Sequence, residues 1–300
     1  MPDYLWSRAA RAVAVSALAF ATTVAAVGAA GATSPEDHPF EVSVGASGIQ
    51  APETGVGGLV SFRIRTDDPN GRQLQLLRPH AGVTFDQVLH DLADAVSTKP
   101  ATAAVGAKAV RGEADALGGA LVTPQVHEQF TEEVAPGAVY LLDLTAFRAD
   151  PAHPVSKRLD LAGTNGQAAN QARYPDGAVL QRDTSAGPRF RTDTVDHAHL
   201  AYLVHNESSQ LHEMQLRPVA ADTTDAQLQN YFAATALGLP AQSPFTGPAT
   251  GFGAISPEHG ALVQAHGLLP GRYALLCLLP DEQFGLTNAA LGMHQIVTLQ

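Results

Sequence analysis

VSFRIRTDDPNGRQLQLLRPHAGVTFDQVLHDLADA, residues 60–95, has a second copy further along the chain, LAYLVHNESSQLHEMQLRPVAADTTDAQLQNYFAA, residues 200–234. In each copy, an alternating apolar strand leads through a polar turn to a second strand that ends in Leu-Arg-Pro, and a helical segment with threonine at its start follows. Residues 132–144 and 265–278 form a further matching pair, in which a Pro-Gly turn leads into an apolar strand. The chain is therefore predicted to contain an internal duplication.

Many short strands between turn signals, with 27 glycines and 20 prolines spread along the chain, are typical of β-sandwiches. We expect an all-β fold of two tandem sandwiches, residues 38–161 and residues 178–300, joined by a polar linker at residues 162–177.

Each copy is predicted to carry one short helical insert. These inserts are residues 85–96 and residues 225–237, the second with Thr223 or Thr224 as its N-cap. The stretches that follow them, residues 101–119 and 238–257, contain many turn-forming residues and are predicted to be loops.

The N-terminal stretch has the pattern of a secretory signal peptide. Arg8 and Arg11 precede an apolar run at residues 12–27, and Ala30-Gly31-Ala32 fits a cleavage signal. Cleavage near Ala32 is expected, and an uncleaved membrane anchor is the alternative. No other run is long enough to span a bilayer, so the mature chain is predicted to be secreted. A net charge of −11 argues against nucleic-acid binding, which needs a basic surface.

Cys277 is the only cysteine, so in an exported protein it is a buried inert thiol, an intermolecular partner or a ligand. Three motifs surround it: N-x(5)-H-E-x-x-L at residues 206–216, P-G-R-Y-x-x-x-C at residues 270–277, and Gly292-Met293 before the last strand. With these motifs the second half resembles the cupredoxins, the small blue copper proteins. The first half resembles them only through the duplication.

The resemblance implies a Greek-key β-sandwich that holds copper at one end through two histidines, one cysteine and one weakly bound methionine. Carried over, His212 is the upstream histidine, Cys277 the thiolate and Met293 the axial ligand. The second histidine is missing, because its position holds Asn288. His294 follows Met293, but on a strand its side chain points to the opposite face. Copper is therefore a possible cofactor of an incomplete site.

The first copy lacks these ligands. The L-R-P alignment places Gln73 at the position of His212, and the Pro-Gly alignment places Asp143 at the position of Cys277. No copper is expected in this half.

No motif for nucleophilic, metallohydrolase, phosphate or dinucleotide chemistry is found, so an enzyme is not supported. One hypothesis is an extracellular binding or structural module with a silent site and an unknown extracellular partner. The other is a copper-binding or electron-transfer protein that uses His212, Cys277 and Met293. Catalysis at an open copper position ranks last, because no substrate pocket can be identified from the sequence.

Overall fold

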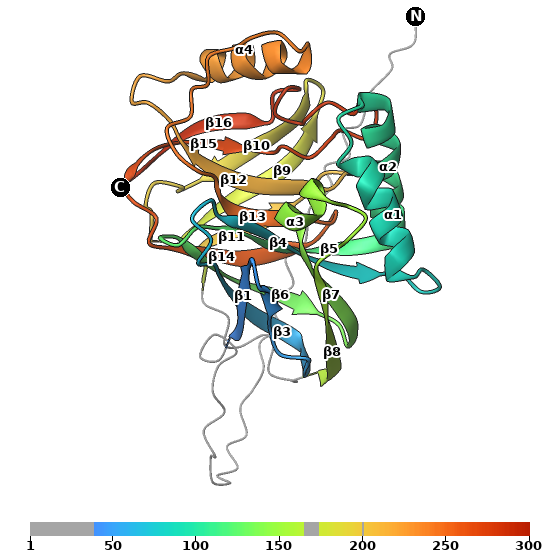
Figure 1. The fold of residues 1–300 in the computed structure, drawn as a ribbon. Helices are drawn as coiled ribbons and strands as arrows, with labels where there is room; N and C mark the ends of the chain where they lie inside the picture. The colour runs from blue at the N-terminus through green and yellow to red at the C-terminus, as the bar shows by residue number, and fades with distance from the viewer. Residues whose placement is uncertain (1–38, 165–173, 200) are drawn as a thin grey trace, which may run out of the picture. The chain divides into compact units, whose positions relative to one another are not determined.

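The computed structural model describes residues 39–164, 174–199 and 201–300, which belong to a compact unit at Ser34–Gln300 (Figure 1). The predicted signal peptide, residues 1–32, lies outside the described residues, and so does most of the predicted linker. Within the described ranges, no helix is both long enough and apolar enough to cross a membrane.

The first half of the described chain forms two four-stranded sheets. One has the order β2-β1-β3-β6, with β1 and β3 parallel, and the other has the order β5-β4-β7-β8. Strand β8 also pairs with the start of β3, which joins the two sheets along one edge. The strands are β1 (Phe40–Gly45), β2 (Gly48–Gln50), β3 (Thr54–Arg65), β4 (Arg72–Pro79), β5 (Ala114–Val122), β6 (His127–Val134), β7 (Gly137–Asp143) and β8 (Ser156–Thr164).

The second half repeats this order strand for strand. One sheet is β10-β9-β11-β14, with β9 and β11 parallel, and the other is β13-β12-β15-β16. The prediction of two tandem β-sandwiches is thereby confirmed. The strands are β9 (Gly177–Thr184), β10 (Gly187–Asp193), β11 (Tyr202–Asn206), β12 (His212–Pro218), β13 (Thr250–Ile255), β14 (Gly260–His266), β15 (Gly271–Leu276) and β16 (His294–Leu299).

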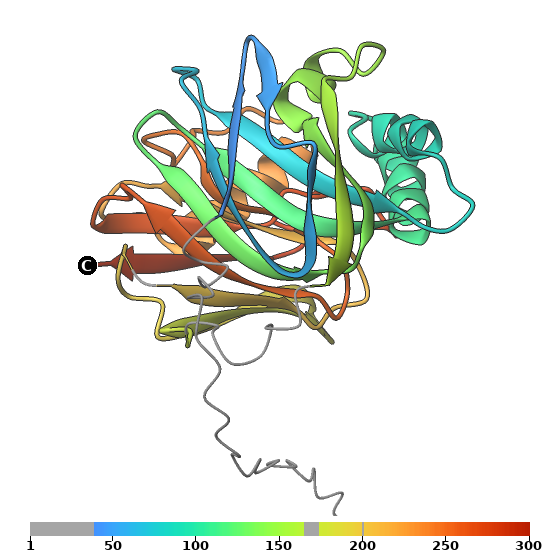
Figure 2. The same cartoon turned by 90° about the horizontal axis from the view of Figure 1, so that it is seen from below.

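The two halves join through equivalent strands (Figure 2). Strand β6 pairs antiparallel with its own counterpart β14, and β5 pairs antiparallel with its counterpart β13, so each sheet continues from one half into the other. His127 lies opposite His266 in this seam, and their rings stack 4.7 Å apart. Pairing of like with like is the geometry of an isologous dimer, here within a single chain.

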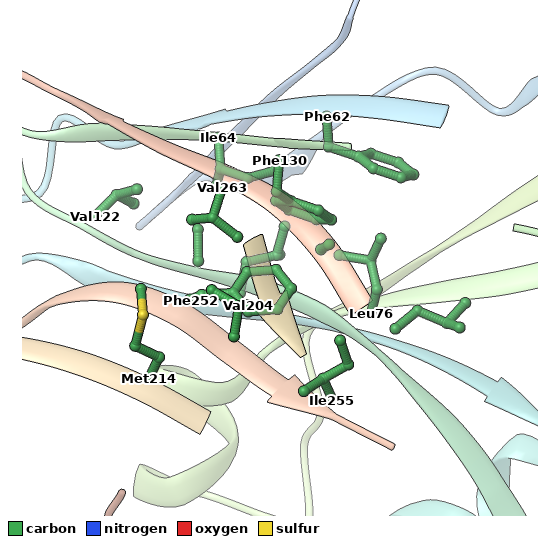
Figure 3. Packing of buried hydrophobic residues seen from close by; sticks show 14 of the residues in the cluster. Phe62, Ile64, Leu76, Val122, Phe130, Val204, Met214, Phe252, Ile255 and Val263 are labelled. Atoms are coloured by element: carbon green, nitrogen blue, oxygen red, sulfur yellow. The ribbon is translucent and has the colours of Figure 1, made fainter. Parts of the chain in front are cut away.

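The apolar core is also continuous across the seam (Figure 3). Phe130 of the first half stacks on Phe62 and meets Phe252 of the second half edge-on, each with ring centroids 5.2 Å apart. Gly118 makes the close approach possible, because a Cβ there would lie 2.2 Å from the Phe252 ring. The backbone of Gly118 also has a φ of 74°, which disfavours other residues.

The helices lie against the β5-β4-β7-β8 and β13-β12-β15-β16 sheets, with α1 and α2 side by side and α4 over β16 (Figure 1). Capping boxes begin two of them: Thr84 with Gln87 at α1, and Thr224 with Gln227 at α4. The predicted inserts are confirmed at these two places. The helices are α1 (Phe85–Ala95), α2 (Pro100–Glu113), α3 (Leu144–Ala149) and α4 (Asp225–Ala236).

Two predicted loops are wrong. Residues 101–119 hold most of α2 and the start of β5, and residues 238–257 contain β13. Glycines suggested turns, but several of them mark close contacts instead. A Cβ on Gly106 would lie 2.6 Å from the Asp91 carbonyl of α1, and one on Gly251 would lie 2.3 Å from the Met214 carbonyl. Among the described residues the first half therefore has three helices, rather than the single insert that was expected.

Candidate metal centre

His212 and Cys277 are in contact at one end of the second sandwich. His212 begins β12 and Cys277 directly follows β15, its antiparallel neighbour, so the two backbones end on the same side. The Sγ atom of Cys277 lies 3.5 Å from Nδ1 of His212. Both side chains are fully buried. The structure thus brings together two of the three ligands that the sequence proposed.

A chain of hydrogen bonds fixes which nitrogen of His212 carries the proton. Ser208 Oγ donates to Asp183 Oδ1 at 2.8 Å, since a carboxylate only accepts. The same Oγ lies 2.9 Å from His212 Nε2 and has only acceptor capacity left, so Nε2 carries the hydrogen. The lone pair on Nδ1 therefore faces the sulfur of Cys277. A second hydrogen bond that fixes the tautomer is also how histidine ligands of metals are oriented.

Burial keeps this pair uncharged. It lowers the pKa of His212 to about 4, against attraction from Asp183 and Asp281. It also raises the pKa of the Cys277 thiol to about 12, with a further contribution from the negative charge of Glu213. At neutral pH the contact is therefore a thiol that donates to an imidazole.

Asn288 and Met293 follow in the loop between β15 and β16. Asn288 is fully buried, its Nδ2 donates to the Leu279 carbonyl at 3.0 Å, and its side-chain amide lowers the pKa of Cys277, against the effect of burial. Its Oδ1 is buried without a hydrogen-bond partner among the described residues. Met293 is fully buried in the same apolar cluster as Cys277, and its carbonyl accepts from the Cys277 amide at 3.3 Å. Asn288 and Met293 thus both lie in the loop beside Cys277, and Met293 joins it through the backbone.

His294 lies on the other face of the chain. Its Nε2 is 3.1 Å from Gln229 Oε1 on α4, and its ring packs near Phe232 of the same helix. Period-two geometry predicted this orientation, which directs the imidazole away from the Cys277 side of the sheet.

The first half has a different pair at the equivalent place. In the ladder of β4 and β7, Leu74 lies opposite Asp143. In the ladder of β12 and β15, Gln215 lies opposite Leu276, and one further step of this register puts Met214 opposite Cys277. Asp143 is therefore the counterpart of Cys277, as the Pro-Gly alignment predicted.

His212 comes two residues before Met214, and Arg72 comes two residues before Leu74, so Arg72 is the counterpart of His212. The predicted alignment of His212 with Gln73 is therefore wrong by one residue. The L-R-P motifs are offset because β4 has one residue more than β12 between Gln75, or its counterpart Gln215, and the motif. Arg72 Nη1 donates to Asp143 Oδ2 at 3.1 Å, and Asp143 is almost completely buried. An ion pair thus occupies the position of the thiol–imidazole contact.

A buried polar network that the sequence analysis missed links the two halves beside this site. Glu213 is fully buried and accepts from Gln73 of the first half at 3.1 Å, from Gln215 at 2.7 Å and from the Leu278 amide at 3.0 Å. Arg148 of α3 donates to Gln73 in turn. Burial raises the pKa of Glu213. In the sequence, this network could have been suspected from the polar residues that alternate with apolar ones in both strands that end in Leu-Arg-Pro.

The donor set does not fit a blue Cu(II) centre. Such a centre needs a thiolate and two imidazoles in a plane, whereas Asn288 offers an amide and burial keeps Cys277 protonated. Across residues 39–164, 174–199 and 201–300, no group of three or more His, Cys, Asp or Glu side chains is arranged to hold a metal ion.

No protein-family model matches the sequence, and no curated protein sequence matches it. Similar solved structures include a dithionite-reduced auracyanin from Roseiflexus castenholzii, with 20% identity over 41% of this chain and 94% of the other and a TM-score of 0.26. A copper-containing nitrite reductase from Thermus scotoductus has 10% identity over 88% and 61% of the two chains and a TM-score of 0.23. Another, from Nitrosomonas europaea, has 8% identity over 87% and 93% and a TM-score of 0.24.

The fold is evident from the strand order of the chain itself. Strands cross between two facing sheets in the same sequence in both halves. With that order, the described chain forms twice in tandem the Greek-key β-sandwich that the resemblance implied.

Proposed function

We propose that this chain is a secreted, non-enzymatic binding or structural module of two domains, residues 38–161 and 178–300, in which the copper position of the second domain has become a structural contact. The observation that carries the proposal is the buried hydrogen bond between Cys277 and His212. A neutral thiol that donates to a neutral imidazole is already satisfied and needs no metal. Secretion is supported by the signal-peptide pattern that ends near Ala32.

The first half supports the same interpretation. At the equivalent place, Arg72 and Asp143 connect the same two neighbouring strands through an ion pair. Two chemically unlike pairs thus occupy one position of the fold. What they share is a polar cross-link between adjacent strands at the end of the sandwich, so the shared role is structural.

Capture of Cu(I) is the second candidate, and one observation favours it. The hydrogen bond to Ser208 leaves the Nδ1 lone pair of His212 facing the sulfur of Cys277. Imidazole, thiolate and the thioether of Met293 are donors that Cu(I) accepts without a second imidazole. Binding would require loss of the Cys277 proton, so its affinity would rise with pH.

The test is the visible spectrum of residues 33–300 with added Cu(II), beside the variant Cys277→Ser. We expect no intense thiolate-to-copper band in either protein. A band that appears in the wild type and is absent from the variant would overturn the proposal. A Cu(I) competition assay then separates the candidates: tight binding that Cys277→Ser abolishes supports Cu(I) capture, and no binding supports the structural module.

A further inference from the structure

A cavity of about 60 Å³ lies between the α1–α2 helix pair and the loop that follows β15. Its walls come from both halves of the chain, so it sits at the seam where the two sandwiches meet. Its floor belongs to β4, β5 and β13. The lining residues are Gln75, Leu77, Leu92, Ala95, Ala107, Val110, Ala116, Leu144, Leu211, Ala254, Leu279, Pro280 and Glu282.

The lining offers no free polar group. The Nε2 of Gln75 donates to the carbonyls of Gly118 and Ala254, and its Oε1 accepts from the Ala254 amide. Both carboxylate oxygens of Glu282 accept from Arg111, at 2.6 and 2.8 Å. All other lining side chains are apolar. A water molecule needs two to four polar partners to be stable in a buried site, and a polar ligand would find none here either.

Small side chains create the space. Ala95 and Ala107 on the helices face Ala116 and Ala254 on the strands, where larger residues would fill the gap. The helices cannot simply collapse onto the sheet. The tight approach of α2 to α1 at Gly106 fixes the two helices to each other, and the Arg111–Glu282 pair ties α2 to the loop of the second half.

We propose that this cavity binds a small apolar molecule, a hydrocarbon of a few carbon atoms. Apolar atoms in the cavity would gain dispersion contacts with its apolar walls, and no free polar side chain there holds water that they would have to displace. The ligand is expected to be apolar because the polar side chains of the lining already have hydrogen-bond partners. It is expected to be small because the cavity volume is about 60 Å³. The proposal does not depend on the function proposed above, because neither His212 nor Cys277 lines the cavity.

The experiment uses xenon as an apolar probe. Secreted chain with labelled alanine, leucine and valine methyl groups is titrated with dissolved xenon and followed by NMR. We expect saturable shifts at the methyl groups that line the cavity, such as Ala107 and Ala254. The variant Ala107→Leu fills the space and should lose these shifts, while Ala101→Leu, exposed on the same helix, should keep them.

The melting temperature and the rest of the spectrum show whether each variant is folded. If Ala107→Leu does not fold, Ala254→Val on the opposite wall is used in the same way. The proposal would be overturned if the methyl groups that line the cavity showed no shifts at the highest xenon pressure. It would also be overturned if a folded Ala107→Leu or Ala254→Val variant showed the same shifts as the wild type. Cys277→Ser should bind xenon as the wild type does, which separates this result from the test of the proposed function.

Discussion

The Cys277 thiol donates a hydrogen bond to the His212 imidazole across 3.5 Å. This contact connects the end of β15 with the start of β12, and Ser208 and Asp183 support it from behind. The contact is therefore part of a chain of hydrogen bonds that joins three strands, β9, β12 and β15, at one end of the second sandwich.

Substitutions of Cys277 and of His212 should lower the free energy of unfolding by different amounts. In Cys277→Ser, a hydroxyl still donates to Nδ1, so we expect a loss of about 1 kcal/mol in the free energy of unfolding. His212→Ala leaves a cavity and removes the partner of Ser208, so we expect a loss of about 3 kcal/mol. Urea denaturation at pH 7 measures both. The exposed His199→Ala should change little. A larger loss in Cys277→Ser than in His212→Ala would contradict this account.

Asn288→His should restore a Cu(II) site. The Asn288 side chain is close enough to Cys277 to lower the pKa of its thiol, so an imidazole there would supply the second histidine beside His212 and Cys277. We expect added Cu(II) to produce an intense visible band in this variant and none in the wild type.

The double variant Asn288→His/Cys277→Ser is the control for that experiment, and it should be colourless. A folded Asn288→His protein that stays colourless with excess Cu(II) would show that this position does not face the metal.

Local signals in the sequence predicted much of the fold. Threonine before the helical segment placed the start of α4 at Thr223 or Thr224, of which Thr224 is the N-cap, and the Pro-Gly turn correctly matched Asp143 with Cys277. These features depend on residues that are close in sequence. The counterpart of His212 in the first copy was misplaced by one residue because β4 has one residue more than β12 before its L-R-P motif, and only pairing with the neighbouring strand shows which residues are equivalent.

The pairing of strands between the two halves could not be predicted from the sequence either, because it depends on residues that are far apart in the chain. Strands β5 and β13 pair although they are far apart in the chain, and their glycines were taken for turns. The crowding around Gly118 and Gly251 comes entirely from residues distant in sequence. Likewise, the polar side chains of Gln75 and Glu213 look unfavourable inside apolar strands until the opposite half supplies their partners.

Gln75→Leu should weaken this seam. The Gln75 amide fills the gap where β5 and β13 separate, and it bonds the Gly118 carbonyl and both backbone groups of Ala254. Leucine would leave these buried groups unpaired, so we expect a loss of about 3 kcal/mol in the free energy of unfolding. Gln264→Leu, which removes a single exposed hydrogen bond to His199, should cost under about 1 kcal/mol. Equal losses in the two variants would contradict a bridging role for Gln75.

Glu128 should make stability fall as the pH rises. Its side chain is fully buried on β6, neither carboxyl oxygen has a partner among the described residues, and burial raises its pKa to about 8. Between the usual pKa of 4.5 and this value, the folded chain keeps the proton and the unfolded chain releases it. The folded state is thus progressively disfavoured from about pH 4.5 to pH 8, by up to about 5 kcal/mol.

Glu128→Gln resembles the protonated carboxyl and removes this dependence. We expect the variant and the wild type to be similarly stable near pH 4.5, and the variant to be more stable by several kcal/mol at pH 8. His212 acts in the opposite direction: its pKa of about 4 lies below the usual 6.5, so stability falls as the pH drops through that range. The contribution of His212 is the same in the wild type and in Glu128→Gln, so it cancels in the difference between their free energies of unfolding. Urea denaturation from pH 4.5 to pH 9 measures that difference, and a value that does not change with pH would show that Glu128 is ionised in the folded chain.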